Sequence, residues 1–338
     1  MKRLKKTFNL LLAFTLIFIL VTGCTSPQQQ VSTNDEEQEV KKLDYPKKPI
    51  TVIVSFAAGG GTDLGVRVLL KHAEKYVGQP LTVVNIAGGG SEVGITELKN
   101  SAPDGYTIGG FNSASIMLTS QREAQYDPIE DFETICLQVN DPRLFAVRAD
   151  DDRFKTFEDF IEYIKNNPDD VTIGTSGAGT TGHFSIEAFN HYGNLKSQAV
   201  HFGGAGESKA GFLGKHVDAI AQTVGEVTQM VEEGQARVIG VQAAERLEKW
   251  PDVPTFKENG IDLVMNSARG FVAPAGTPKE IVEFLADAFK KAMDEPEYIE
   301  EMDKMGLPIY YLGPNEYKEW NIEEKHSFDE LVKIVKFE

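Results

Sequence analysis

Apolar and polar positions in the first part of the chain alternate between short β-branched runs and longer segments with helical spacing. The apolar runs at residues 50–54, 81–85 and 106–110 predict buried strands. Residues 64–77 and 91–100, which lie between these runs, are predicted to form helices. Strand–helix repeats of this length predict parallel strands that are joined by right-handed crossovers.

Bare glycine turns join the first two strands to their helices. Residues 59–61 are three consecutive glycines, and Thr62 and Asp63 after them are residue types that cap helices. A second triple glycine occupies residues 88–90, with Ser91 as the expected cap. Such turns direct backbone N–H groups and the positive end of a helix dipole at a bound anion. The first turn matches neither the dinucleotide fingerprint nor the P-loop, so we predict an anion site of another kind.

The second half of the chain repeats this arrangement. Residues 171–192 predict a strand, a turn rich in glycine and hydroxyl groups at 176–181, and a helix. Two α/β halves with such turns would enclose a cleft, because ligands collect at the carboxyl ends of parallel strands. The other expected elements are strands at residues 132–139, 143–150, 236–242, 266–274 and 308–312, helices at 157–165 and 316–333, and two further β/α units within 199–234.

The N-terminus predicts export from the cytoplasm. A basic segment with four Lys and Arg residues precedes an apolar stretch at residues 10–21, and Val21-Thr22-Gly23-Cys24 follows. These four residues resemble the lipobox of bacterial lipoproteins, which implies cleavage before Cys24 and lipidation of its thiol and amine. The alternative is an uncleaved signal anchor. In either case the protein is expected to work outside the cytoplasm and to be tied to the membrane.

Charge and cysteine content restrict the function further. The formal net charge of −17 argues against nucleic acid as a partner, because such binding depends on cationic contacts to phosphate. The chain has two cysteines, so a lipidated Cys24 leaves Cys136 unpaired, and neither a disulfide framework nor a cysteine metal site is expected. Cys136 is predicted to be buried in a strand. Residues 25–43 are almost free of apolar side chains and predict a disordered tether.

Seven motifs, taken in their order and spacing, resemble one family over Tyr45 to Glu338. They are FAAGGGTD, PDGYTI, TSGAGTTGH, HFGGAGES, HVDA, ERLEKWPDVPTFKENG and APAGTP. This set resembles the Bug-type extracytoplasmic solute receptors of tripartite tricarboxylate transporters. The resemblance implies an α/β fold of the type II periplasmic-binding-protein class, with an interdomain cleft and two crossing hinge strands. The implied organisation is a lipoprotein signal peptide at 1–23, a tether at 24–44, domain I at 45–145 and 268–338, and domain II at 146–267.

The family also implies ligand-binding positions, carried over motif by motif. The first loop would hold a carboxylate through backbone N–H groups and water, without a cluster of arginines, and the 176–181 turn would face it. Arg269, in an Arg-Gly pair found in some branches, is expected to face the cleft near the hinge. The candidate ligand-binding residues are Phe56, Ala58, Gly59, Gly60, Gly61, Thr62, Asp63, Asn112, Ser113, Ser176, Gly177, Thr180, Thr181, Phe202, Gly203 and Arg269.

Three positions depart from the family pattern. Phe202 stands where the family has tyrosine, which removes a phenol hydroxyl from the expected site. Ile86 replaces a common arginine and removes a nearby cation, and Ser55 replaces a proline. These departures bear on the identity of the ligand and leave the expected fold unchanged.

The expected function is therefore a monomeric, cofactor-free receptor that closes over a small carboxylate and delivers it to a pair of membrane permease subunits. Citrate or another tricarboxylate, a dicarboxylate, an acidic amino acid and an aromatic monoacid all remain open, and so does ligand sensing for a signalling partner. A metal receptor would use His183, Glu187 and His191, which are spaced four residues apart on one predicted helix. A hydrolase built on Ser176 and His183 lacks the G-x-S-x-G elbow, so we do not expect an enzyme.

Overall fold

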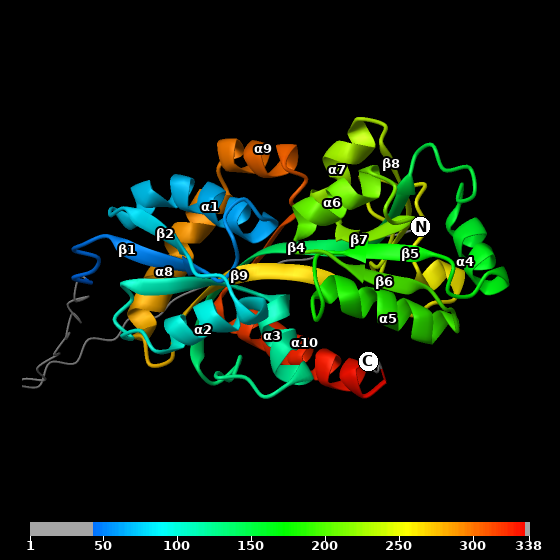
Figure 1. Ribbon diagram of the computed structural model, residues 1–338. Coiled ribbons are helices and arrows are strands. Elements are labelled where there is room, and N and C mark those ends of the chain that lie inside the picture. The colour runs from blue at the N-terminus through cyan, green and yellow to red at the C-terminus, as the bar shows by residue number, and fades with distance from the viewer. Residues whose placement is uncertain (1–42, 335–338) are drawn as a thin grey trace, which may run out of the picture. The chain divides into compact units, whose positions relative to one another are not determined.

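The computed structural model describes residues 43–334, which belong to one compact unit (Figure 1). The predicted signal peptide, the lipidation site Cys24 and the tether up to residue 42 lie outside the described residues. Between residues 43 and 334, no helix is long and apolar enough to cross a membrane.

The described residues form ten strands and ten α-helices, with short 3-10 turns at Gly89–Ser91 and Lys257–Asn259. The strands are β1 (Ile50–Val54), β2 (Leu81–Asn85), β3 (Thr107–Asn112), β4 (Phe132–Arg148), β5 (Thr172–Thr175), β6 (Gln198–His201), β7 (Ala219–Thr223), β8 (Ala236–Val241), β9 (Asn266–Pro274) and β10 (Ile309–Leu312). The helices are α1 (Gly61–Val77), α2 (Glu92–Lys99), α3 (Ser113–Gln121), α4 (Phe157–Asn166), α5 (Thr181–Gly193), α6 (Ala205–Leu213), α7 (Val224–Glu232), α8 (Lys279–Met293), α9 (Pro296–Lys304) and α10 (Pro314–Ile334).

One mixed sheet runs through this unit in the order β2-β1-β3-β9-β4-β7-β5-β6, with β8 and β10 also paired to β4. The first three strands are parallel to one another, as their strand–helix repeats predict. Helices α1, α8 and α9 cover one face beside these strands, and α2, α3 and α10 cover the other (Figure 1). Each face is therefore sealed by its own apolar core, which is the arrangement that parallel strands require.

The long strand β4 joins two groups of strands. Its first part, up to Pro142, pairs with β9, and the part from Arg143 onward pairs with β7 and β8. The chain returns near Met265, whose N–H bonds to the Gln242 carbonyl at 2.9 Å. We call residues 43–142 and 266–334 the first lobe and residues 143–265 the second lobe. The sequence analysis predicted two strands, at residues 132–139 and 143–150, where the structure has the single strand β4. Asn140 and Pro142 interrupt the apolar run at the point where β4 changes partners.

Helix α3 was not predicted from the sequence. It has almost no separation of polar from apolar faces, and it begins because the Asn112 side chain accepts a hydrogen bond from the Ser115 N–H at 3.1 Å. Serine and apolar side chains share its buried surface. Its start is consequently fixed by a cap at the end of β3 and not by hydrophobic periodicity.

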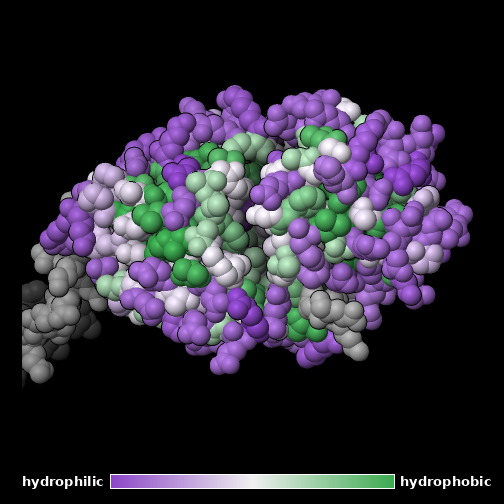
Figure 2. Space-filling model, viewed as in Figure 1, coloured by the Kyte–Doolittle hydropathy of each residue, from purple (hydrophilic) through white to green (hydrophobic). Residues whose placement is uncertain are grey.

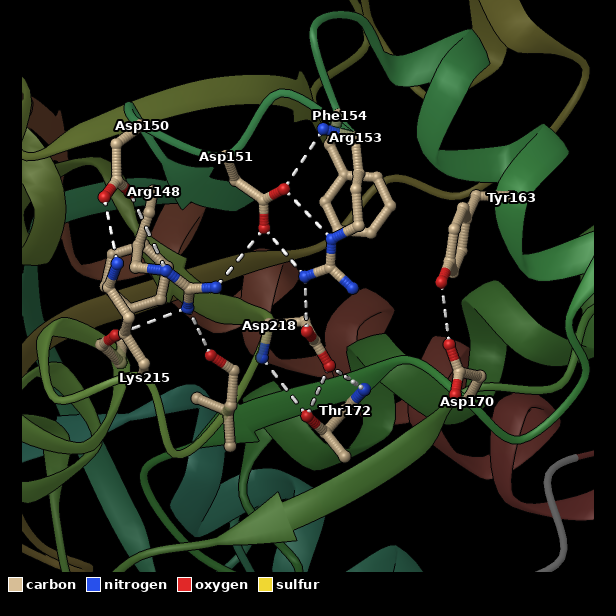
Figure 3. A network of polar contacts seen from close by, with 12 residues as sticks. Arg148, Asp150, Asp151, Arg153, Phe154, Tyr163, Asp170, Thr172, Lys215 and Asp218 are labelled. Atoms are coloured by element: carbon tan, nitrogen blue, oxygen red, sulfur yellow. Dashed lines mark hydrogen bonds and ion pairs between the residues drawn. The ribbon is translucent and has the colours of Figure 1, made fainter.

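A network of charged side chains closes the second lobe at the end of β4 that is remote from the crossing (Figure 3). Arg153 Nη2 lies 2.8 Å from an Asp151 oxygen and 2.6 Å from an Asp218 oxygen. The other Asp218 oxygen accepts the Thr172 N–H at 3.0 Å. The turn after β4 is thereby bonded to the segments that lead into β5 and β7, and hydrogen bonds from Arg153 lower the pKa of Asp151.

Candidate ligand-binding site

The first glycine turn is held from inside by Asp63. Its carboxylate accepts hydrogen bonds from the Gly59 N–H at 2.9 Å, from Arg67 Nε at 3.0 Å and from Asn85 Nδ2 at 2.9 Å. Burial alone would raise the pKa of this carboxyl, but these hydrogen bonds lower it overall. Helix α1 begins at Gly61, with Gly60 at its N-cap position, so Thr62 and Asp63 lie inside the helix and are not its caps.

The outer side of this turn is open. A Cβ added to Gly59 would meet no atom within 4 Å, and one added to Gly60 would meet only a backbone oxygen at 3.6 Å. Ala58 is exposed, and Phe56 packs against the core while its carbonyl accepts a hydrogen bond from Asn85 at 3.0 Å. The first N–H groups of α1 have no partner within the helix, so they remain available to a ligand at this opening.

The second lobe contributes a matching turn at residues 176–180. Thr180 caps α5: its hydroxyl accepts from the His183 N–H at 3.4 Å and donates to the Gly177 carbonyl at 2.8 Å. Gly177 and Gly179 have positive φ angles of 150° and 71°, which explains why glycine occupies these positions. Ser176 is half-buried in the same turn.

Residues at the two ends of α3 contact one of these turns each. Gln121 Nε2, at the end of α3, donates to the Gly179 carbonyl at 2.7 Å. Within the first lobe, the Asn112 side chain reaches Thr62 Oγ1 at 3.4 Å. Figure 2 shows a groove between the surface over α1 and the surface over α6 and α7, lined largely by white to pale green surface of intermediate to weakly hydrophobic character.

Arg269, which the sequence analysis expected to face the cleft near the hinge, lies on β9 opposite Val139 of β4. The side chain is 6 % exposed, and its Nη1 forms an ion pair with Asp141 at 3.2 Å. A Cβ on Gly61 would lie 3.3 Å from Nη2, so the guanidinium group lies against the first turn of α1. Asp141 also accepts the Gly225 N–H at 3.3 Å, at the start of α7, and its burial raises its pKa.

A second arginine, Arg143, was missed by the sequence analysis. It is 4 % exposed, and its Nε donates to Thr181 Oγ1 at 2.8 Å while Nη1 donates to the Ala221 carbonyl at 3.3 Å. Burial lowers its pKa to about 10. The sequence did show a charged residue, Arg143, at the start of an apolar strand. The position of Arg143 under α5, however, depends on β4 continuing through Pro142. The first turns of α1 and α5 therefore each have a buried arginine beside them, and of these two arginines the sequence analysis expected only Arg269.

Three candidate residues are engaged elsewhere. The Phe202 ring packs against Gly174 and Gly211, where an added Cβ would lie 3.1 and 2.5 Å from ring atoms. The Gly203 N–H donates to a Glu207 oxygen at 2.9 Å. The Ser113 hydroxyl faces α10, where it donates to Glu324 at 2.7 Å, and it also accepts the Ala268 N–H at 2.8 Å.

The proposed metal ligands do not converge. His183 Nε2 lies 3.7 Å from Glu187, but His183 Nδ1 accepts the Gly179 N–H at 3.1 Å. The His191 ring packs against the neighbouring Tyr192. No group of three His, Cys, Asp or Glu residues between 43 and 334 is arranged to hold a metal ion. Burial, with a smaller contribution from nearby His201, lowers the pKa of His183 to about 4.

Known proteins resemble this chain over most of its length. Residues 66–336 match the tripartite tricarboxylate transporter family receptor, TctC. A UPF0065 protein from the gbd 5' region of Cupriavidus necator is 35% identical over 279 residues, which cover 82% of this chain and 85% of that protein. BugT of Bordetella pertussis is 26% identical over 96% of both chains.

Solved structures give the same result. The periplasmic binding protein BugD is 26% identical, with a TM-score of 0.78 over 87% of this chain and 100% of its own. MatC from Rhodopseudomonas palustris, solved with bound malate, is also 26% identical, with a TM-score of 0.76 over 85% of this chain and 100% of its own.

Proposed function

Because this chain belongs to the tripartite tricarboxylate transporter receptor family, we propose that it is a receptor that binds a small carboxylate between its two lobes. The family resemblance seen in the sequence is confirmed, and so is the mixed α/β fold of periplasmic solute-binding proteins. Its relatives are solute receptors and not enzymes, which also agrees with the prediction, and the family indicates an extracytoplasmic location.

The observation that carries the proposal is the pair of helix starts, one from each lobe, with a buried arginine beside each. Gly61 and Thr181 begin α1 and α5, and Arg269 and Arg143 lie against them. A carboxylate that accepts charge-assisted hydrogen bonds gains roughly 1.5–3 kcal/mol from each. The family neighbour MatC was solved with malate, a small carboxylate.

Ligand binding is expected to shift an equilibrium between open and closed arrangements of the lobes. A carboxylate held by α1 and α5 together makes both sets of contacts only when the lobes are close. The Gln121–Gly179 hydrogen bond joins the lobes on the same side as these turns and would form in the closed arrangement. The crossings near Pro142 and Met265 are the natural hinge, because the chain passes there from one lobe to the other.

Delivery and anchoring complete the proposal. The family implies that the closed receptor hands its ligand to a pair of membrane permease subunits. Lipidation at Cys24 would keep the receptor near those subunits, through a tether that ends near residue 44. Substitution of Cys24 by alanine in the exporting cell should move the protein from the membrane fraction to the soluble fraction. Retention of the variant in the membrane fraction would indicate an uncleaved anchor instead.

The binding site is tested by Gly60→Leu. Gly60 has a φ angle of −78° and open space around it, so leucine fits the backbone and projects into the opening. Calorimetric titration with malate should show loss of binding by this variant and an unchanged unfolding temperature. The exposed Lys165→Leu on α4 serves as the control, and it should bind as the wild type does. Wild-type affinity in Gly60→Leu would contradict the assigned site.

A further inference from the structure

We propose that a pocket between α10 and the end of α5 binds a small organic ammonium ion that carries an aromatic or aliphatic body. The pocket has a volume of about 340 Å³, which is within the range of small-molecule sites. Its walls come from α10 in the first lobe and from Tyr192 and the segment 262–265 in the second lobe (Figure 1). The proposed carboxylate receptor makes no use of this pocket.

The pocket is separate from the glycine turns of the candidate carboxylate site. Thr181 begins α5 beside one of those turns, whereas Tyr192 is in the last turn of the same helix. At a rise of about 1.5 Å per residue, these two residues lie roughly 16 Å apart along the helix. No residue of either glycine turn lines the pocket. A ligand bound here would therefore leave the carboxylate site free.

Aromatic and aliphatic side chains form the apolar part of the pocket. Trp320 and Phe328 contribute from α10, and Tyr192 and Val264 contribute from the second lobe. Tyr192 is 40 % exposed and Val264 is 47 % exposed, so apolar surface is left uncovered there. An apolar ligand body would bury this surface, and the ring faces of Trp320 and Tyr192 also attract cations.

The charged side chains that line this pocket are all acidic. They are Asp262, Glu323, Glu324 and Glu330, and no Lys or Arg is among the lining residues. Asp262 and Glu330 each form an ion pair with a lysine, whereas Glu323 and Glu324 form none with residues 43–334. This distribution of charge favours a cationic ligand over a neutral or anionic one.

Glu324 supplies the specific contact that we assign to the ammonium group. One of its carboxylate oxygens accepts a hydrogen bond from the Ser113 hydroxyl at 2.7 Å. The other, Oε2, is shielded from solvent and has no hydrogen-bond partner in the described part of the chain, and the same is true of Trp320 Nε1 one turn earlier. Buried polar atoms in native proteins nearly always have partners. Because Glu324 lines the pocket, an ammonium group bound there would supply the donor that Oε2 lacks.

Binding should depend on pH, because a proton and the ligand compete for Glu324. Burial raises the pKa of Glu324 to about 7. The titratable groups around it, Tyr317 and Glu323 on α10 and Asp262 in the second lobe, are acidic as well, and Ser113 on α3 is neutral. The carboxyl group is therefore uncharged below this pKa and ionised above it. Affinity for an ammonium ion should rise as the pH increases through about 7.

The proposal is tested with phenethylamine against phenethyl alcohol, an uncharged compound with the same body. Trp320 reports binding by its fluorescence in a Trp250→Phe variant, where it is the single remaining tryptophan. An alkylammonium group keeps its proton at about pH 8. The amine should then change the Trp320 emission and bind about ten- to a hundredfold more tightly than the alcohol. Ethylamine, which lacks the aromatic body, should bind about tenfold more weakly than phenethylamine.

Glu324→Gln keeps an acceptor for Ser113 but removes the charge. The preference for the amine over the alcohol should fall to within about threefold in this variant, and its pH dependence should disappear. The control is Glu319→Gln, an exposed acid on the same helix that does not line the pocket, which should keep both.

A second variant does not depend on the folding of Glu324→Gln. Val264→Lys, at an exposed position, introduces an ammonium group of the protein at the pocket and should abolish amine binding. Equal affinity of the wild type for amine and alcohol, or wild-type preference in Glu324→Gln, would overturn the inference. So would the absence of any phenethylamine binding, which would leave water as the occupant of the pocket. The proposed function stands in each case, because the carboxylate site shares no residue of the glycine turns with this pocket.

Discussion

Asp63 holds the first glycine turn, and Asp63→Asn should loosen both the fold and the site. One carboxylate oxygen accepts from Asn85 and Arg67, and the other accepts from the Gly59 N–H and Arg67. An amide keeps one acceptor and places an NH₂ group against a donor. Either orientation of the introduced amide therefore leaves at least one of these N–H donors without its acceptor.

The expected cost follows from the burial of each partner. Asp63 is 2 % exposed, so loss of the charged acceptor for Gly59 or Asn85 costs roughly 1.5–3 kcal/mol. Arg67 is 47 % exposed, so its ion pair contributes about 0–1 kcal/mol at most. We expect the free energy of unfolding to fall by about 2–3 kcal/mol in Asp63→Asn and by less than about 1 kcal/mol in Arg67→Gln. The buried acceptor, and not the surface ion pair, is expected to dominate.

Urea unfolding of both variants at neutral pH tests this difference, and acidification adds a second test. Because hydrogen bonds keep the folded pKa of Asp63 low, its stabilisation is present above the ordinary carboxyl pKa and is lost as the pH falls through the folded value. Asp63→Asn should consequently lose less stability on acidification than the wild type. Equal destabilisation by Asp63→Asn and Arg67→Gln would refute the reasoning.

Three further predictions concern stability. Arg153→Gln should unfold at a higher pH than the wild type during acid titration, because Arg153 lowers the folded pKa of Asp151; coincident titration curves would contradict this. Gly270→Ala should lower the free energy of unfolding by about 3 kcal/mol, because the added Cβ would lie 2.5 Å from a carbonyl oxygen of β4. The control Gly206→Ala, whose Cβ would meet no atom within 4 Å, should leave the unfolding temperature unchanged. Similar unfolding temperatures for the two variants would show that the pairing of β4 with β9 tolerates the extra atom. Burial raises the folded pKa of Glu324 to about 7, so the contribution of Glu324 to stability falls as the pH rises from the ordinary carboxyl pKa to that value. Glu324→Gln should remove this pH dependence and should be more stable than the wild type at pH 8. A wild type whose stability is constant across this pH range would argue against the burial of Glu324.

Local patterns predicted much of the fold. The bounds of β1, β2 and β9 agree with the apolar runs at residues 50–54, 81–85 and 266–274. Each of these strands ends at a turn, so neighbouring residues in the chain determine its limits. The glycine turns at the starts of α1 and α5 were found in the same way, since glycine and hydroxyl residues directly follow a strand.

Features that depend on distant residues were not predicted. Arg143 lies under α5 because β4 continues through Pro142 and pairs Arg143 with Thr223, which comes much later in the chain. Asp63 holds the first turn because Asn85 comes beside it at the end of β2. The Phe202 ring packs against Gly211 of α6, so its lost hydroxyl concerns the interior of the second lobe and not the opening between the turns.

The central claim is that this receptor binds a small carboxylate in its cleft. A thermal-shift screen of the mature protein against carboxylates, amino acids, sugars and divalent metals tests it most directly. A ligand that binds only the folded state adds about 2.7 kcal/mol at a hundredfold excess over Kd, enough to raise the unfolding temperature measurably. We predict a shift with one class of carboxylates and none with sugars. A shift with zinc or manganese alone, or with sugars and not carboxylates, would contradict the account.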